Sequence, residues 1–277
     1  MRTVRLPSGE RIPGLGQGTW HMAENPADRD DELRALRLGL DLGLTLIDTA
    51  EMYGDGAAEE LVADAIDGRR DEVFLVSKVL PANATRHGTK AACEHSLKRL
   101  RTDRIDLYLL HWRGQLPLEG AVEAFTELKQ AGKIRHWGVS NLDAIDLAEL
   151  ITVAGGDEVE TDQVLYNLTR RQVEFELLPW CRDRGMPLMA YSPVNRGALV
   201  GDDTVVEIAE KHGAAAAQVA LAWVLRHDDV CAIPKASIPD HVRENAGALE
   251  LQLDHDDLKL LDEEFPPPSG PAPLGLY

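Results

Sequence analysis

Cysteine is scarce in this chain. Its 277 residues include 3 cysteines, Cys93, Cys181 and Cys231, which lie far apart and show no metal-ligand spacing. An odd and sparse set of this kind argues against a disulfide framework and indicates reduced thiols. We therefore expect a cytoplasmic protein without a metal site.

Basic residues and long apolar runs are also in short supply. The chain has 29 Lys and Arg residues against 47 Asp and Glu residues, a formal net charge of -18. Such a charge argues against nucleic acid or anionic membranes as partners, although a few local cations can still hold an anionic ligand. No stretch reaches the roughly 18 apolar residues of a membrane span, and the first residues lack the apolar core of a signal peptide.

What the chain does have is a regular alternation of short apolar runs and amphipathic stretches. The apolar runs predict strands at residues 15–19, 44–47, 73–77, 105–110, 134–139, 160–164, 187–190 and 230–233. The intervening patterns predict helices at residues 30–42, 57–66, 89–100, 118–130, 144–153, 174–184, 204–212, 215–225 and 239–249. A hairpin is expected over residues 3–13, and a short helix, residues 254–264, precedes a Pro/Gly-rich tail that we expect to be irregular.

This alternation indicates an α/β fold, the (β/α)₈ TIM barrel. Strands that alternate with helices pair in parallel through right-handed crossovers, and eight units suit one barrel domain over residues 1–277. A nucleotide-binding open sheet should carry its glycine fingerprint between the first strand and a helix. Here Gly16 and Gly18 lie within the expected first strand, so the barrel is favoured.

Four chemically capable residues follow three successive strands. Asp48 ends one strand and Tyr53 lies in the loop after it, while Lys78 and His111 follow the next two. Singly, each has a plainer explanation, such as a helix cap, a packed ring, a surface charge or a hydrogen-bonded barrel residue. Because the carboxyl ends of barrel strands share one rim, the four should converge, and their joint occurrence favours a site.

Together these residues suit the reduction of a carbonyl group. A phenol has a pKa near 10, and a neighbouring ammonium lowers it. A carboxylate would keep Lys78 charged and oriented, and an imidazole could orient the carbonyl oxygen. Tyr53 would then act as a general acid, but it supplies no hydride, so a cofactor is required.

With these residues the chain resembles the aldo-keto reductases, from Leu6 to about Glu264. The family's Asp-Tyr-Lys-His tetrad matches Asp48, Tyr53, Lys78 and His111, and the segments GVSN (138–141), AYSPV (190–194), IPKAS (233–237) and RENA (243–246) match its cofactor motifs. The resemblance implies NADPH as cofactor, with NADH possible. It assigns the carboxamide to Ser140, Asn141 and Gln163, ring stacking to Tyr191, the pyrophosphate path to Ser192 and Val194, the 2′-phosphate to Lys235 and Ser237, and the adenine to Glu244 and Asn245. Trp20 and Trp112 would join Tyr53 and His111 around the substrate.

The chain departs from the family pattern at two places. His241 stands where many members place an arginine near the 2′-phosphate, and the chain continues only briefly after its last helix, which implies a more open substrate pocket. The resemblance is strongest to small bacterial NADPH-dependent aldehyde and methylglyoxal reductases. Aldehyde, ketone, sugar and 2-oxoaldehyde substrates all stay open, and we expect a monomer.

Two other functions remain as alternatives. A regulatory or sensor protein on the same fold would bind the cofactor and turn over slowly. A barrel hydrolase or isomerase would use Asp48 or Glu51 as a base and would need no nicotinamide.

Overall fold

Eight parallel strands form the centre of the structure, a computed structural model that describes residues 2–276. The strands follow the chain in order, and isolated bridges from Leu15 to Ala232 and from Gly18 to Lys235 close the sheet into a barrel. They are β3 Gln17–Gly18, β4 Leu46–Asp48, β5 Phe74–Val79, β6 Ile105–Leu110, β7 Ile134–Ser140, β8 Asp162–Leu165, β9 Leu188–Tyr191 and β10 Val230–Ile233. The predicted (β/α)₈ barrel is confirmed.

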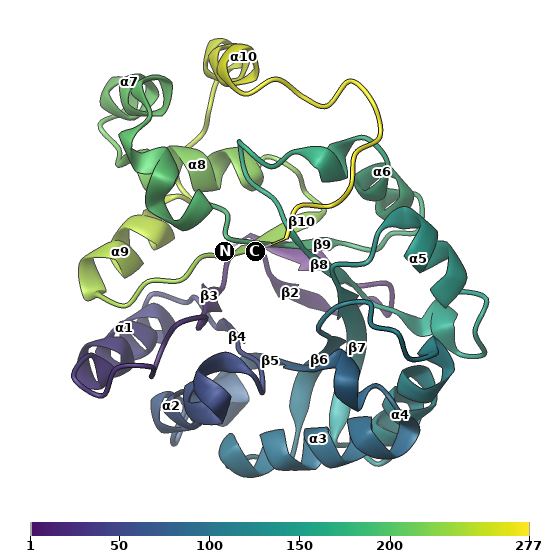
Figure 1. Ribbon diagram of the computed structural model, residues 1–277. Helices are drawn as coiled ribbons and strands as arrows, with labels where there is room; N and C mark the ends of the chain where they lie inside the picture. Colours follow the sequence, from purple (N-terminus) through teal and green to yellow (C-terminus); the bar gives the residue numbers. More distant parts are fainter. Residues whose placement is uncertain (1, 277) are drawn as a thin grey trace.

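Helices surround the barrel on all sides (Figure 1). They are α1 Arg29–Asp41, α2 Ala57–Ala65, α3 Arg86–Arg99, α4 Leu118–Gln130, α5 Ala144–Leu150, α6 Leu177–Arg182, α7 Asp203–His212, α8 Ala216–Val224, α9 Pro239–Gly247 and α10 His255–Glu264. Every residue of β6 is buried, as expected for a parallel strand covered on both faces. Between strands and helices lie large packed rings such as Phe125 and Trp137, whose centroids are 5.2 Å apart. Within residues 2–276, no helix is long and apolar enough to cross a membrane.

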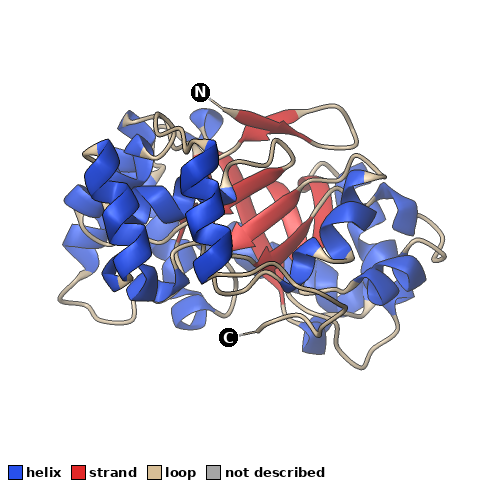
Figure 2. Ribbon diagram, turned by 90° about the horizontal axis from the view of Figure 1, so that it is seen from above, coloured by secondary structure: helices blue, strands red, loops and turns tan. Residues whose placement is uncertain are grey.

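An antiparallel hairpin closes the amino-terminal end of the barrel. Its strands are β1 Thr3–Arg5 and β2 Arg11–Pro13, which confirms the expected hairpin. Val4, Leu6 and Ile12 form one buried cluster with residues from the barrel strands, including Phe74 and Leu107. Figure 2 shows the hairpin at one end of the barrel and the carboxyl-terminal tail at the other. Any site open to solvent therefore belongs at the carboxyl end of the strands.

Most element boundaries differ from the sequence prediction by a few residues, and two of the differences have a clear physical reason. β5 continues to Val79, so Lys78 lies inside a strand and not at its end, because its ammonium finds polar partners within the barrel. The helix predicted at residues 174–184 is shorter in the structure at both ends. A 3₁₀ turn occupies Gln172–Glu174, and α6 begins at Leu177, which puts Pro179 in its first turn, where proline is tolerated.

The tail after α10 returns to the barrel. It runs across the carboxyl-terminal face toward the centre of the view in Figure 1, and Gly275 packs close to Leu165 and Arg170. Leu276 lines the central cavity, so the tail adds a wall that the sequence pattern did not predict.

Candidate active site

A cavity of about 760 Å³ opens among the loops that follow the barrel strands. Sixteen of the residues predicted from the sequence line it: Trp20, Asp48, Tyr53, His111, Trp112, Ser140, Asn141, Gln163, Tyr191, Ser192, Val194, Lys235, Ser237, His241, Glu244 and Asn245. Lys78 does not line the cavity but is fully buried, with its ammonium against Tyr53. The structure thus brings all the predicted site residues to one place.

Lys78 connects the members of the predicted tetrad. Its Nζ donates to Oδ2 of Asp48 at 2.7 Å, to the backbone oxygen of Thr49 at 2.9 Å and to Oη of Tyr53 at 3.1 Å. An ammonium has three hydrogens, and each has an acceptor here. Burial alone would lower the pKa of Lys78, but the Asp48 carboxylate and the Tyr53 oxygen reverse this and raise it. Burial raises the pKa of Asp48, and the Lys78 ammonium and the Gln163 amide oppose that rise. We assign a charged Lys78 paired with an ionised Asp48, because the carboxylate accepts from both groups at 2.7 Å.

The pKa of Tyr53 moves opposite to the sequence expectation. Lys78 lowers it, as expected, but burial raises it more, and Asp48 adds to the increase. The net direction is upward, so the expectation of a lowered pKa is wrong. A phenol nine-tenths buried pays a desolvation penalty on ionising, which the single ammonium does not offset. Tyr53 is therefore a protonated phenol, able to donate.

His111 faces the same phenol. Its ring meets the ring of Tyr53 edge-on, with 5.7 Å between centroids, and its Nδ1 is buried without a hydrogen-bond partner. Burial, helped by the charge of Lys78, lowers the pKa of His111 to about 2. The imidazole is neutral at any ordinary pH and can orient an oxygen without carrying charge.

Asn141 joins several of the predicted carboxamide contacts. Its Nδ2 donates to the backbone oxygen of His111 at 3.2 Å, and its Oδ1 accepts from Oη of Tyr191 at 2.9 Å. The residue has a φ of 59°, a left-handed conformation that asparagine tolerates better than most residues. Nearby, Gln163 donates from Nε2 to Oδ1 of Asp48 at 2.7 Å. Two predicted cofactor residues, Asn141 and Gln163, are therefore hydrogen-bonded directly to predicted catalytic residues.

The other end of the cavity combines β10 with the first turns of α9. Lys235 is exposed, and its Nζ lies 3.1 Å from Oγ of Ser237. Arg243, two residues after His241 on α9, pairs with Asp240 at 3.1 Å and does not line the cavity. It does not replace the arginine that the family pattern places at His241.

Several cavity residues were missed in the sequence analysis. They are His21, Met52, Pro193, Arg196, Gly197, Val200, Ala217 and Leu276, along with Gly18, Ile233 and Ala236 of the expected strand ends. Most of them could have been predicted from the sequence, because they stand next to predicted site residues in the chain. Arg196 and Leu276 could not, because loop conformation and tail packing place them.

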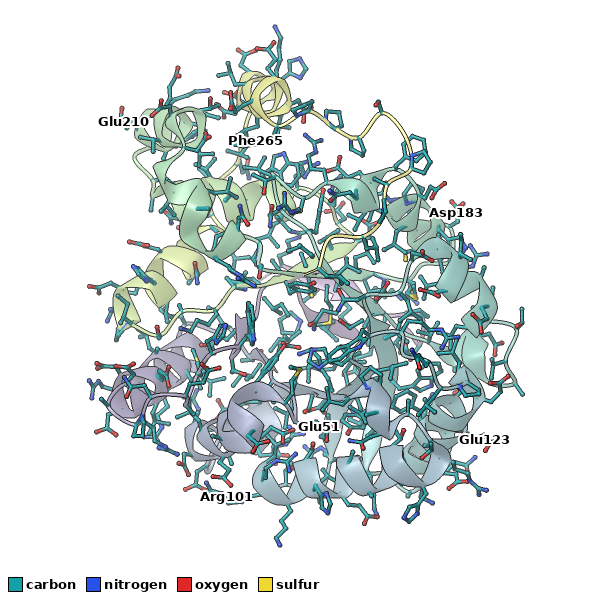
Figure 3. The ribbon with its side chains drawn as sticks, viewed as in Figure 1. Glu51, Arg101, Glu123, Asp183, Glu210 and Phe265 are labelled. Atoms are coloured by element: carbon teal, nitrogen blue, oxygen red, sulfur yellow. The ribbon has the colours of Figure 1, made fainter. Side chains whose placement is uncertain are left out.

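Glu51 has a structural place that the sequence did not suggest. Figure 3 labels it beside the barrel, in the loop between β4 and α2. Its Oε1 accepts from the backbone N–H of Leu80 at 2.7 Å and from Nδ2 of Asn83 at 3.1 Å. Glu51 thus connects the loop that carries Tyr53 to the segment that follows β5. β5 is the strand that carries Lys78.

Within residues 2–276, no group of three or more His, Cys, Asp and Glu side chains could hold a metal ion.

Comparisons with known proteins place the chain in a family. Residues 14–264 match the family model described as "Aldo/keto reductase family". The chain is 51% identical to methylglyoxal reductase YeaE of Escherichia coli over 280 residues, which cover 99% of both proteins. It is 34% identical to a glyoxal reductase of Bacillus subtilis, covering 94% of this chain and 91% of that protein. An aldo/keto reductase from Klebsiella pneumoniae, crystallised with NADP and acetate, superimposes with a TM-score of 0.97 at 48% identity, covering 100% of this chain and 99% of the other. By site geometry, sequence and fold, this chain belongs to the aldo/keto reductase family.

Proposed function

We propose that the protein is an NADPH-dependent reductase of small aldehydes and ketones, with methylglyoxal and related 2-oxoaldehydes as its substrates. One observation carries the proposal: Tyr53, on the wall of the cavity, accepts a hydrogen bond from the buried Lys78–Asp48 pair. The names of the E. coli and B. subtilis relatives support the substrate class.

The residues present fit the cofactor. Lys235 and Ser237 offer a cation and a hydroxyl for a phosphate, while Tyr191 offers a ring beside the amide of Asn141. α9 begins with Pro239, and a helix start favours an anion. When bound, NADPH supplies a hydride to the carbonyl carbon. Asn141, Gln163 and Ser140 would hold its carboxamide and so fix which carbon faces the substrate.

The geometry around Tyr53 indicates how the proton reaches the carbonyl oxygen. Because Lys78 donates to Oη, the phenol's own hydrogen is directed elsewhere and can be donated to the carbonyl oxygen. Neutral His111 can donate a ring N–H to the same oxygen and hold it in place. Asp48 keeps Lys78 charged, and the ammonium stabilises the phenolate that remains after transfer.

The alternative functions receive less support. As a base, Glu51 would have to give up its bonds to Leu80 and Asn83, and Asp48 its bonds to Lys78 and Gln163. The complete tetrad also argues against a protein that only binds the cofactor.

The rest of the proposal concerns the protein's setting. We place residues 1–277 in one catalytic domain that acts as a monomer, since one chain supplies every predicted site residue. The buried free thiols of Cys93, Cys181 and Cys231 support a reducing, cytoplasmic location.

Tyr53→Phe tests the function. The ring and its packing are kept while the proton is lost, so NADPH affinity should stay nearly unchanged and kcat for methylglyoxal should fall by about 10²- to 10⁴-fold. The measurements are NADPH oxidation against a panel of carbonyl compounds and NADPH binding by tryptophan fluorescence. Retention of more than about a tenth of wild-type kcat, with chemistry rate-limiting, would contradict the role of Tyr53. Absence of turnover with every carbonyl, despite tight NADPH binding, would favour the regulatory alternative.

A further inference from the structure

The loop that carries Tyr53 leaves the barrel sheet at Glu51. The backbone N–H of Glu51 still donates to the carbonyl of Lys78 on β5, at 3.4 Å. Two residues later, the backbone N–H of Tyr53 turns back to the carbonyl of Ala50 at 3.1 Å. The backbone N–H of Tyr53 is thus bonded within its own loop, so a further hydrogen bond from this loop to β5 has to come from a side chain.

The Glu51 carboxylate supplies this bond. Its Oε1 accepts from the backbone N–H of Leu80 at 2.7 Å and from Nδ2 of Asn83 at 3.1 Å. In a parallel ladder every second residue of a strand bonds to the same neighbour, and Leu80 is the second residue after Lys78. The carboxylate therefore takes the place that a backbone carbonyl would have if the loop continued as a strand. A bond to an ionised acceptor is also stronger than one between neutral groups.

The segment that Glu51 binds is itself fixed to the barrel wall. The backbone N–H of Asn83 donates to the carbonyl of Leu80 at 2.9 Å, and the carbonyl of Asn83 accepts from Oγ1 of Thr89 on α3 at 3.0 Å. Glu51 thus joins the Tyr53 loop to a segment that is held by β5 on one side and by α3 on the other.

The position of this loop sets the contact on which the proposed chemistry depends. Oη of Tyr53 lies 3.1 Å from Nζ of Lys78. Lys78 is fully buried and is held by Asp48 at 2.7 Å, so the ammonium cannot follow the phenol if the loop moves. A displacement of about 1 Å at a reacting group can reduce a rate by about 10²-fold. Glu51 does not line the cavity, so its effect on the reaction passes through Tyr53.

We propose that Glu51 is a positioning residue for proton transfer. Its bonds to Leu80 and Asn83 hold Oη of Tyr53 beside Lys78 and toward the substrate. This inference rests on the proposed reductase function and adds to it a residue outside the tetrad.

Two substitutions of similar length test the role of the carboxylate. Glu51→Gln keeps an oxygen acceptor without the charge, and Glu51→Met removes the acceptor. In a single turnover with NADPH and methylglyoxal, the rate of NADPH oxidation should fall by about ten- to a hundredfold in Glu51→Met and by less than about threefold in Glu51→Gln. NADPH affinity should stay nearly unchanged in both variants, because Leu80 and Asn83, the partners of Glu51, do not line the cavity.

Glu160→Met is the matched control. Oε2 of Glu160 also accepts from a backbone N–H, that of Ser8 at 3.0 Å, but this bond joins the hairpin to the opposite end of the barrel. The variant should lower the free energy of unfolding at least as much as Glu51→Met, since Glu160 is the more deeply buried of the two. It should leave the single-turnover rate unchanged, which separates positioning from a general loss of stability.

Asn83→Leu tests the same contact from its other side, and it keeps the inference testable if Glu51→Met does not fold. It removes one of the two donors to Glu51 and should slow the single turnover by a smaller factor. In a folded Glu51→Met variant the added substitution should have no further effect, because the bond that the two residues share is already absent.

Three kinetic outcomes would overturn the positioning role. A wild-type rate in folded Glu51→Met would show that the loop needs no such bond. Equal losses in Glu51→Gln and Glu51→Met would assign the effect to the charge. A loss confined to NADPH affinity would assign Glu51 to cofactor binding.

Hydrogen exchange of the Leu80 amide gives a readout without turnover. The exchange rate should increase in Glu51→Met and stay close to that of the wild type in Glu51→Gln, because only glutamine keeps an acceptor for this N–H. Unchanged exchange in Glu51→Met would contradict the bond itself. Faster exchange in Glu51→Met, when the wild type reduces no carbonyl compound, would contradict the proposed function and leave the bond from Glu51 to Leu80 in place.

Discussion

Oδ1 of Asp48 accepts a 2.7 Å hydrogen bond from Nε2 of Gln163, a residue predicted to hold the cofactor. The other carboxylate oxygen, Oδ2, pairs with Lys78 at 2.7 Å. One buried carboxylate therefore connects the expected carboxamide site to the ammonium that contacts Tyr53. A substitution of Gln163 or of Lys78 should therefore change the rate of proton transfer from Tyr53. Lys78 gives the clearer test because it contacts Tyr53 directly.

Removing the ammonium should impair the enzyme across neutral pH. In Lys78→Met the phenol keeps its burial but loses the one neighbour that lowers its pKa. The apparent pKa of the proton-transfer step should rise, and each unit corresponds to about 1.4 kcal/mol. The measurement is kcat for reduction from about pH 6 to pH 10, with circular dichroism as the folding control. An active variant with a wild-type pH profile would contradict the assignment.

Titration of His111 should not appear in the dependence of kcat on pH, but it should lower the free energy of unfolding in acid. Its pKa of about 2 in the folded protein lies below the roughly 6.5 of an unfolded chain. The unfolded state alone therefore binds a proton as pH falls below about 6.5, and the free energy of unfolding decreases toward low pH. From about pH 7 to pH 5 the loss from this residue is about 2 kcal/mol. Urea unfolding at both values should show a smaller loss in His111→Gln, and equal losses would contradict the buried neutral imidazole.

Cofactor preference should respond to Lys235 and His241 in opposite directions. The ratio of kcat/KM for NADPH over NADH should drop in Lys235→Ala, which removes the cation beside Ser237. It should rise in His241→Arg, because a charged fork replaces an imidazole, by roughly one to two powers of ten. If neither substitution moves the ratio more than about twofold, the 2′-phosphate is held elsewhere.

Asp162 should make the protein less stable as pH rises. The residue is fully buried on β8, and neither carboxyl oxygen has a hydrogen bond of full geometry. The backbone N–H groups of Leu142 and Asn141 lower its pKa, but less than burial raises it. Burial raises its pKa well above the usual value, so the folded state keeps a proton that the unfolded state loses above about pH 4. The free energy of unfolding is thus highest below that pH and declines as pH rises toward the folded pKa.

Asp162→Asn tests this penalty because it keeps the shape and removes the ionisation. Between about pH 5 and pH 8 the wild type should lose more stability than the variant, because only the wild type carries this ionisation. Chemical denaturation at the two values measures the difference. Parallel losses in the two proteins would mean that Asp162 is ionised in the fold.

Residues whose position follows from strand order were predictable from the sequence. Asp48, Lys78 and His111 follow neighbouring strands, and parallel barrel strands end at one rim. The pKa of Tyr53 was predicted in the wrong direction because its burial depends on Trp20 and Ala58, which pack on it only in the folded barrel. Arg196 could not be predicted, because two successive left-handed residues, Asn195 and Arg196, turn it toward Trp20.

The path of the tail has a practical consequence for anyone handling the protein. Because Leu276 lines the cavity, a peptide fused to this end of the chain would be attached close to the cavity wall. A purification tag there should slow the entry of ligands into the cavity or occupy it as a ligand would. Kinetic constants measured with the tag would then differ from those of the untagged protein. The hairpin end of the barrel lies on the opposite side, so an amino-terminal tag keeps clear of the chemistry (Figure 2).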